Sequence, residues 1–199
     1  VATGTYSGYD TELQPVPIEI YSNSPDQRNA VVHIPYGDSV RTYDGSDGWV
    51  SSPDRALPLL PLSGGNLEGA RIEAIASFPS EIQQAFSQWR VGFPTFIGDR
   101  EVQVAQGTNP GQGPVNMYFD TESGFLVRLV RYTDTQIGTV PTQVDYSDYR
   151  DVSGLLMPFH SVVTWTNGQA TIEFEEIQPN VPIDAARFAT PAPSPPPQF

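Results

Sequence analysis

Short runs of alternating apolar and polar residues, separated by glycine and proline, recur along most of the chain and restrict it to a β-rich fold. In PVPIEIYS, Val16, Ile18 and Ile20 alternate with Pro17 and Glu19. Because alternate side chains of a strand share one face, this pattern predicts half-buried strands. The 20 prolines and 17 glycines in 199 residues favour many short elements over long helices.

Tight turns are expected where Asp-Gly or Asn-Gly separates two such runs. Asp47-Gly48 precedes a tryptophan-containing run, and Asn167-Gly168 joins MPFHSVVTWT to ATIEFEEIQ. Asn-Gly suits the two-residue turn of an antiparallel hairpin. The sequence therefore predicts a mainly β fold of roughly ten strands, in a strongly curved antiparallel sheet or half-open β-barrel.

The middle of the chain, about residues 66–89, has a different pattern and predicts one or two short inserted helices. Asn66 is a candidate N-cap for a helix through LEGARIEAIASF, and EIQQAFSQW is a second candidate helix. In the second, Ile82, Phe86 and Trp89 fall on one face at helical spacing. We expect both helices to pack against one face of the sheet.

The length and composition predict one domain with a short tail. Residues 1–189 are expected to form a single β half-barrel, and the proline-rich residues 190–199 an extended or disordered tail. Within the domain, LPLLPLSGG (57–65) is broken by proline and is expected to lie outside the sheet. The glycines of GGNLEG and NPGQG are expected to lie in turns.

The net charge and the absence of cysteine exclude several classes of function. A formal charge of −13 would repel nucleic-acid phosphates and anionic membranes, and it favours basic proteins or cations as partners. With no cysteine, the chain has no disulfide, no thiolate chemistry and no c-type haem attachment. No apolar run approaches the length of a membrane span. No signal peptide is visible, so a secreted form would already be processed.

The motifs of the common enzymes are also missing. The sequence has no G-x-S-x-G elbow, no phosphate-binding glycine loop and no dinucleotide fingerprint. Its two histidines, His33 and His160, fall inside predicted strands, where a lone histidine is more often packed than catalytic. The acidic clusters lack the spacing of a calcium loop and indicate a solvated acidic face. We predict no catalytic, cofactor-binding or metal-binding residues.

Three segments resemble a known family: YDGSDGWV (43–50), DTESGFLVRL (120–129) and DYRDVSGLLMPF (148–159). They are similar to the turns and strand starts of the LolA/LolB-like superfamily of outer-membrane lipoprotein-sorting proteins. The resemblance extends from about residue 3 to residue 189. The residues that match its two main turns are Asp120, Ser123, Gly124, Asp148, Tyr149, Arg150, Val152, Gly154, Pro158 and Phe159.

The resemblance implies a periplasmic, half-open antiparallel β-barrel closed by helices, with an apolar cavity that can hold acyl chains. It supplies no catalytic residues. The sequence departs from the family in lacking the leading amphipathic helix, as though an upstream segment were missing, and in its short, proline-rich insertion. Its two methionines and modest apolar fraction of 38% argue against a generous lipid cavity. The chain also resembles domains that are appended to, or encoded with, multi-haem cytochrome c subunits of photosynthetic reaction centres.

Two functions compete on these grounds, and a hydrolase is a distant third. The first is a non-catalytic periplasmic accessory domain without a cofactor, which docks on a larger envelope or electron-transfer complex such as a cytochrome c or reaction-centre subunit. Its partner contacts are predicted to be Arg128, Arg131, Glu173 and Glu175. The alternative is a periplasmic carrier of lipid or lipoprotein acyl chains. Its cavity is predicted to be lined by Ile82, Phe86, Trp89, Tyr118, Leu126 and Val130.

The hairpin MYFDTESGFLVRLVRYTD (117–134) combines a family turn with two of these arginines. Asp120 to Gly124 is interpreted as a turn that sets the strand register, with Gly124 in a conformation of positive φ. Strand alternation places Arg128 and Arg131 on opposite faces. An arginine on the inner face would need a position near the barrel rim or a carboxylate partner.

Overall fold

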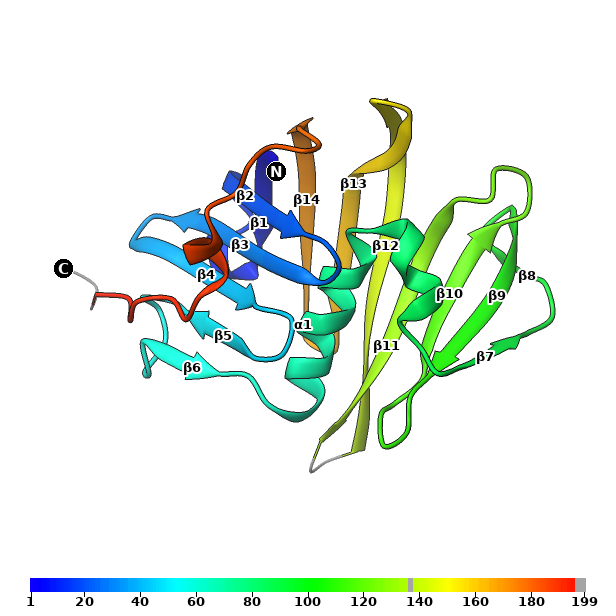
Figure 1. Ribbon diagram of the computed structural model, residues 1–199, viewed down its shortest axis with the longest axis horizontal. Helices are drawn as coiled ribbons and strands as arrows, with labels where there is room; N and C mark the ends of the chain where they lie inside the picture. Colours follow the sequence, from blue (N-terminus) through cyan, green and yellow to red (C-terminus); the bar gives the residue numbers. More distant parts are fainter. Residues whose placement is uncertain (136–137, 196–199) are drawn as a thin grey trace.

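The computed structural model describes residues 1–135 and 138–195. Within them the chain forms a 14-stranded antiparallel sheet that does not close on itself (Figure 1). The strands are β1 (Ala2–Gly8), β2 (Val16–Asn23), β3 (Gln27–Ile34), β4 (Gly37–Tyr43), β5 (Gly48–Ser51), β6 (Leu59–Pro61), β7 (Gln88–Val91), β8 (Thr95–Ile97), β9 (Arg100–Thr108), β10 (Val115–Asp120), β11 (Leu126–Thr135), β12 (Gly138–Val152), β13 (Leu155–Trp165) and β14 (Gly168–Ile177). The helices are α1 (Gly64–Ala76) and the 3-10 turns η1 (Tyr9–Thr11), η2 (Pro79–Gln84) and η3 (Ala185–Phe188).

Most strands pair with their neighbours in sequence, and the first and last strands pair with each other. The sheet order is β6-β5-β4-β3-β2-β1-β14-β13-β12-β11-β10-β9-β7, with β8 paired to β9. The β1–β14 pairing joins two meanders into one continuous surface. Its outer edges are β6 at one end and the short strands β7 and β8, both paired to β9, at the other. The predicted fold class, a mainly β half-open barrel with short helices inserted mid-chain, is confirmed.

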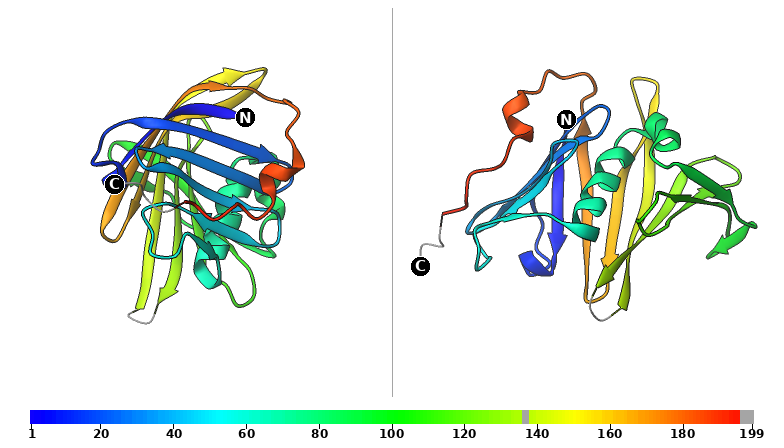
Figure 2. Two further views of the ribbon diagram at one scale, coloured as in Figure 1. Left: turned by 90° about the vertical axis from the view of Figure 1, so that its left-hand side faces the viewer. Right: turned by 60° about the horizontal axis from the view of Figure 1, so that its bottom comes forward.

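Helix α1 lies inside the curve of the sheet. We call the two meanders, β1–β6 and β7–β14, the two arms of the sheet. Helix α1 contacts β3 and β4 on the first arm and β11 on the second. Figure 2 shows the two arms on either side of the helix. Two glycines of GGNLEG allow this close approach, because a Cβ on Gly65 would clash with Thr133 and a Cβ on Gly69 would clash with Arg131. The prediction that these glycines lie in turns is therefore wrong, since both belong to the helix.

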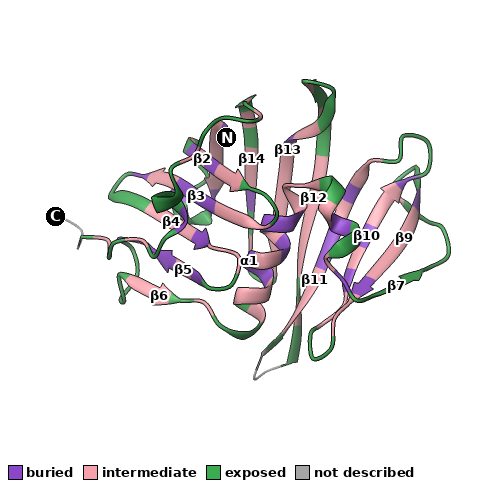
Figure 3. Ribbon diagram, viewed as in Figure 1, coloured by how far each residue is buried: buried purple, intermediate pink, exposed green. Residues whose placement is uncertain are grey.

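Three apolar clusters stabilise this arrangement, and buried residues concentrate where the sheet faces the helix (Figure 3). The largest cluster joins α1 and η2 to strands β10 and β11, with Met117 and Val115 almost fully buried. A second cluster lies between β1, β2 and β3, and includes Ile18 and Ile20. A third holds Tyr43 against the small residues of α1.

The turn from Asp120 to Gly124 has the expected geometry. Asp120 Oδ1 accepts hydrogen bonds from the backbone N–H groups of Glu122 and Ser123, at 2.9 and 2.7 Å. Gly124 has φ +75° and donates its N–H to the Asp120 carbonyl at 2.9 Å. These contacts set where β11 begins, so this part of the sequence interpretation is confirmed.

Two expectations for the middle of the chain differ from the structure. The second predicted helix exists only as the 3-10 turn η2, because Gln88–Val91 pairs with β9 as an edge strand instead. The proline-broken segment also enters the sheet, since Leu59–Pro61 pairs with β5 as β6. Proline is tolerated there because β6 is an edge.

The described part of the proline-rich tail, residues 190–195, runs along the arm that contains β5. Ser51 Oγ donates a hydrogen bond to the Ala192 carbonyl at 2.9 Å, and the Ser194 N–H donates to the Pro58 carbonyl at 3.3 Å. The tail is extended here. Residues 196–199 lie outside the described part of the chain.

Candidate functional site: a cavity between the sheet and helix α1

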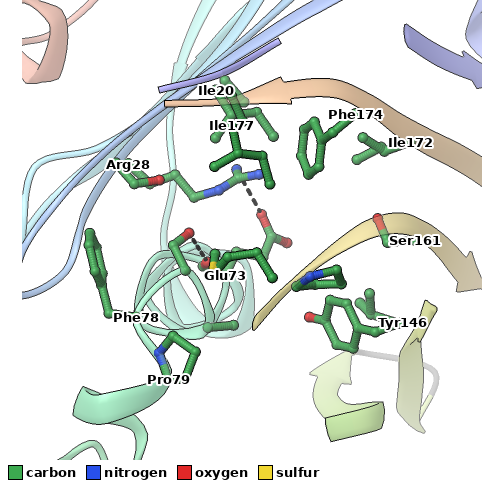
Figure 4. A pocket seen from close by; sticks show the side chains of 18 of the residues that line it. Ile20, Arg28, Glu73, Phe78, Pro79, Tyr146, Ser161, Ile172, Phe174 and Ile177 are labelled. Carbon is green, nitrogen blue, oxygen red and sulfur yellow. Dashed lines mark hydrogen bonds and ion pairs between the residues drawn. The ribbon is translucent and has the colours of Figure 1, made fainter. Parts of the chain in front are cut away.

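A cavity of about 1870 Å³ lies in the curve of the sheet. Its walls come from the inner faces of β1–β3 and β12–β14, from α1, and from the segment 177–183 that follows β14. Figure 4 shows Ile20, Ile172, Phe174 and Ile177 directed into it from the sheet. The walls are mainly apolar.

Strand alternation explains why these walls are apolar. On β14, Ile172 and Phe174 line the cavity. The residue after each of them, Glu173 and Glu175, is exposed on the other face of the strand. On β13, Ser161 and Val163 line the cavity in the same way. The period-two pattern therefore separates an apolar inner face from an acidic outer face.

Some of the apolar residues that line the cavity are exposed to solvent. Leu155 and Leu156, at the start of β13, are 61% and 48% exposed, and Val181 is 37% exposed. All three also line the cavity. Large apolar side chains left in water near a concave apolar surface are typical of an interaction site.

The polar part of the wall is a cluster of three arginines around one glutamate. Glu73 of α1 approaches Arg28 of β3 at 3.8 Å, Arg41 of β4 at 3.4 Å and Arg131 of β11 at 3.6 Å. Figure 4 shows Arg28 directed toward Glu73. We call these four residues the arginine cluster. It connects both arms of the sheet through the helix.

The electrostatics of the arginine cluster keep Glu73 ionised. Burial alone would raise the pKa of this carboxyl, but the positive charges of Arg41, Arg28 and Arg131 outweigh burial and hold its pKa below the ordinary value. Burial lowers the pKa of the Arg28 and Arg131 guanidinium groups, and Glu73 partly offsets that effect.

The charges that line the cavity have the opposite sign to those of the whole chain. Among the described residues, the lining includes four arginines, Arg28, Arg41, Arg55 and Arg131, and two acidic side chains, Asp10 and Glu73. The chain as a whole has 23 acidic residues and 10 Lys or Arg, for a net charge of −13. The cavity is thus a positive region inside an acidic protein.

The structure brings some of the predicted cavity residues to this site. Ile82, Trp89 and Leu126 line the cavity. Phe86 is buried in the adjoining cluster, where its ring centroid lies 5.1 Å from that of Trp89 in a T-shaped contact. Within the described part of the chain, the residues that line the cavity do not include Tyr118 of β10 or Val130 of β11.

The predicted partner-contact residues lie in different environments. Arg128 pairs with Asp145 of β12 at 2.5 Å, whereas Arg131 belongs to the cavity wall. These two arginines lie on opposite faces of β11. Glu173 and Glu175 are exposed on the outer face of β14.

Sequence reasoning missed Arg28, Arg41 and Glu73. One signal was present: Arg28 has the same phase as Ala30 and Val32 on β3, and all three line the cavity. An arginine in phase with apolar inward residues indicates a buried charge that needs a partner. The identity of that partner depends on how the sheet curves around α1.

Among the described residues, the lining of the cavity does not include either histidine. His33 Nδ1 is 2.8 Å from Asp38 Oδ1, and His160 Nδ1 is 3.5 Å from Glu173 Oε1. Among residues 1–135 and 138–195, no three His, Asp or Glu side chains are grouped so that they could hold a metal ion. No helix in the same residues is long and apolar enough to cross a membrane.

Solved structures of LolA-like proteins have a fold similar to that of this chain. No protein-family profile matches the chain, and no curated protein matches it in sequence. A LolA superfamily protein from Nitrosomonas europaea is similar with a TM-score of 0.57 at 12% identity, over 88% of this chain and 83% of that one. These values indicate a shared fold.

Two further structures give the same result. One, from Vibrio parahaemolyticus, bears the name of an outer membrane lipoprotein-sorting protein domain, with a TM-score of 0.59 at 10% identity. The other is a DUF1329 family protein from Desulfovibrio piger, with a TM-score of 0.60 at 10% identity. Each alignment covers 94% of this chain and 88% of the other. The fold expected from the sequence resemblance is therefore confirmed.

Proposed function

We propose that this protein is a non-catalytic carrier that binds the acyl chain of a lipid or lipoprotein inside the half-barrel. The observation that carries the proposal is the apolar cavity of about 1870 Å³ between the sheet and α1. Pockets for small ligands usually measure about 300–1,000 Å³, so this one is large enough for a long chain. The sequence-based argument against a generous cavity is not supported by this volume.

The shape of the site fits a long apolar ligand better than a compact one. The walls extend from β1 across β14 to β12, and Ala2, Phe174 and Val163 lie on the successive strands β1, β14 and β13 along that path. Burying a methylene group from water contributes about 0.8 kcal/mol. A chain of many methylene groups would therefore be held by the hydrophobic effect alone, without precise hydrogen-bond geometry.

Support also comes from the structural neighbours. One of them bears the name of a lipoprotein-sorting protein domain, and another belongs to the LolA superfamily. A periplasmic location would follow from such a role and is part of this proposal. Docking on a cytochrome or reaction-centre complex stays a prediction, and the contacts described above do not bear on it.

A binding titration tests the proposal. The protein is titrated with a fluorescent long-chain fatty acid analogue, and we expect saturable binding to one class of site. In the Ser161→Trp variant the indole would extend into the cavity between Tyr146 and Ile172, the cross-strand neighbours of Ser161. We expect this variant to lose at least tenfold in affinity.

Val162→Trp is the matched control. Val162 is the next residue on β13, and the described lining of the cavity does not include it. The same indole would there lie on the outer face, and affinity should be unchanged. Absence of saturable binding to the wild-type protein would refute the carrier function. Equal losses in both variants would show that the probe does not occupy this cavity.

A further inference from the structure

We propose that Arg28, Arg41 and Arg131 form a binding site for the oxyanion head group, a carboxylate or a phosphate, of an amphiphile. The acyl chain of this amphiphile would occupy the apolar part of the cavity. The inference rests on the carrier function proposed above and adds the chemical class of the ligand: an anionic amphiphile.

The geometry of the arginine cluster is convergent. Arg28 and Arg41 come from adjacent strands of one arm, and Arg131 comes from β11 on the other arm. All three lie within 3.8 Å of the same carboxylate group, that of Glu73. Side chains from distant parts of the chain thus concentrate positive charge at one place in the cavity wall.

The charges of the arginine cluster do not balance. One glutamate faces three arginines, so the cluster carries two more positive than negative charges. A network that only attached α1 to the sheet would be expected to balance its charges, because an uncompensated charge is costly to bury. Arg28 and Arg131 are largely buried, with side chains only 15% and 13% exposed. A ligand oxyanion would remove part of this excess.

The hydrogen-bond donors of the arginine cluster are also incompletely used. Among the described residues, the buried Arg41 Nε has no hydrogen-bond partner, although Glu73 Oε2 lies 3.4 Å away. Arg28 Nη1 lies 3.8 Å from Glu73 Oε2, which is longer than a hydrogen bond. Arginine's planar fork suits carboxylate and phosphate oxygens. The cluster therefore has N–H groups that can donate hydrogen bonds to the oxygens of a bound oxyanion.

The apolar wall begins directly beside these donors. Ala30 and Val32 follow Arg28 on the same face of β3 and line the cavity. Figure 4 shows Ile20, Ile177 and Phe174 near the Arg28–Glu73 pair. One ligand can therefore place its head group at the arginines and its chain along β2, β1 and β14. This pairing of charged and apolar walls is the chemistry of an amphiphile site.

The test compares two ligands with the same chain and different heads, dodecanoate and dodecanol, by calorimetric titration at neutral pH. Charged hydrogen bonds contribute more than neutral ones, so we expect the wild-type protein to bind dodecanoate about tenfold or more tightly than dodecanol. In Arg41→Gln this preference should fall to less than threefold, while dodecanol affinity stays unchanged. Arg90→Gln is the control, because Arg90 is exposed on β7, and both affinities should be unchanged.

The outcomes distinguish failure of the carrier function from failure of the head-group site. If neither ligand binds the wild-type protein, the carrier function itself fails. If both bind equally, or if Arg41→Gln weakens both equally, the carrier function stands and the head-group site is refuted. Inorganic phosphate is the third ligand of the test. If phosphate bound as tightly as dodecanoate, the arginines would form a site for free anions, and the proposal of an amphiphile ligand would be refuted. Retained dodecanol binding shows that Arg41→Gln keeps its fold.

Discussion

Arg131 lies directly against Gly69 of helix α1: a Cβ atom on Gly69 would be 2.5 Å from Arg131 Cζ. Glu73 lies four residues further along the same face of the helix and reaches Arg131 Nη2 at 3.6 Å. The absence of a side chain at position 69 therefore allows the guanidinium to fit between the helix and β11. This contact joins the helix to the cavity wall.

Gly69→Ala tests that contact. Replacing glycine by alanine inside a helix normally stabilises it by about 0.5–1 kcal/mol. Here the new methyl group would displace Arg131, so we expect no gain or a loss of about 1 kcal/mol in the free energy of unfolding. Denaturant titration measures it. Asn66→Ala, at an exposed position of the same helix, should be neutral or stabilising. A stabilised Gly69→Ala would contradict the described contact.

Glu73→Gln should destabilise the protein. It removes the negative charge that lies within 3.8 Å of all three arginines, and breaking a buried ion pair is costly because unpaired charge is left behind. We expect a loss of about 2 kcal/mol, below the range for fully buried pairs because the Glu73 side chain is 29% exposed. Thermal or urea unfolding measures it. Glu175→Gln, on the exposed outer face, should change stability by less than about 0.5 kcal/mol.

The same carboxyl predicts part of the acid sensitivity. The pKa of Glu73 is lowered in the folded protein, so the unfolded chain binds its proton more readily as the pH falls. Its contribution to stability is complete above the ordinary value of 4.5 and is lost as pH falls through the lowered, folded-state pKa. The stability difference between wild type and Glu73→Gln should therefore shrink on acidification. A difference that stays constant down to pH 2 would contradict this assignment.

Gly4→Ala should weaken the junction between the two meanders. Gly4 pairs with Phe174 at a register shift in the β1–β14 pairing, and an added Cβ would clash with the Glu173 backbone carbonyl. Backbone cannot move aside as a flexible side chain does, so we expect a loss of about 1–3 kcal/mol. Thr3→Ala, the adjacent substitution, should cost less. Equal effects in urea titration would argue against the close approach.

The sequence predicted the parts of the fold that depend on local rules. The turn at Asp120 and the hairpin at Asn167 follow from side-chain capping and from glycine's tolerance of unusual backbone angles. Alternation likewise placed Arg128 and Arg131 on opposite faces. The second helix was overestimated because Trp89 and its neighbours satisfy helical spacing, yet pair with β9 at the sheet edge. Edge pairing is a tertiary contact that local spacing does not encode.

The arginine cluster could not be predicted in the same way. Arg28, Arg41 and Arg131 lie far apart in sequence, and only the curvature of the sheet around α1 brings them to Glu73. The same curvature creates the cavity volume that the modest apolar content argued against. Sequence composition reports how much apolar surface a chain has, whereas the fold decides whether that surface encloses a space.

Native mass spectrometry with a long-chain fatty acid tests the central claim, that the half-barrel carries an acyl chain, most directly. The protein is incubated with palmitate and its bound mass is recorded under gentle ionisation. We predict discrete bound palmitate in the wild-type protein and in Val162→Trp, and its loss in Ser161→Trp, in which the indole would occupy the cavity. Wild-type protein that stays ligand-free under these conditions, or Ser161→Trp that binds as well as wild type, would contradict the account.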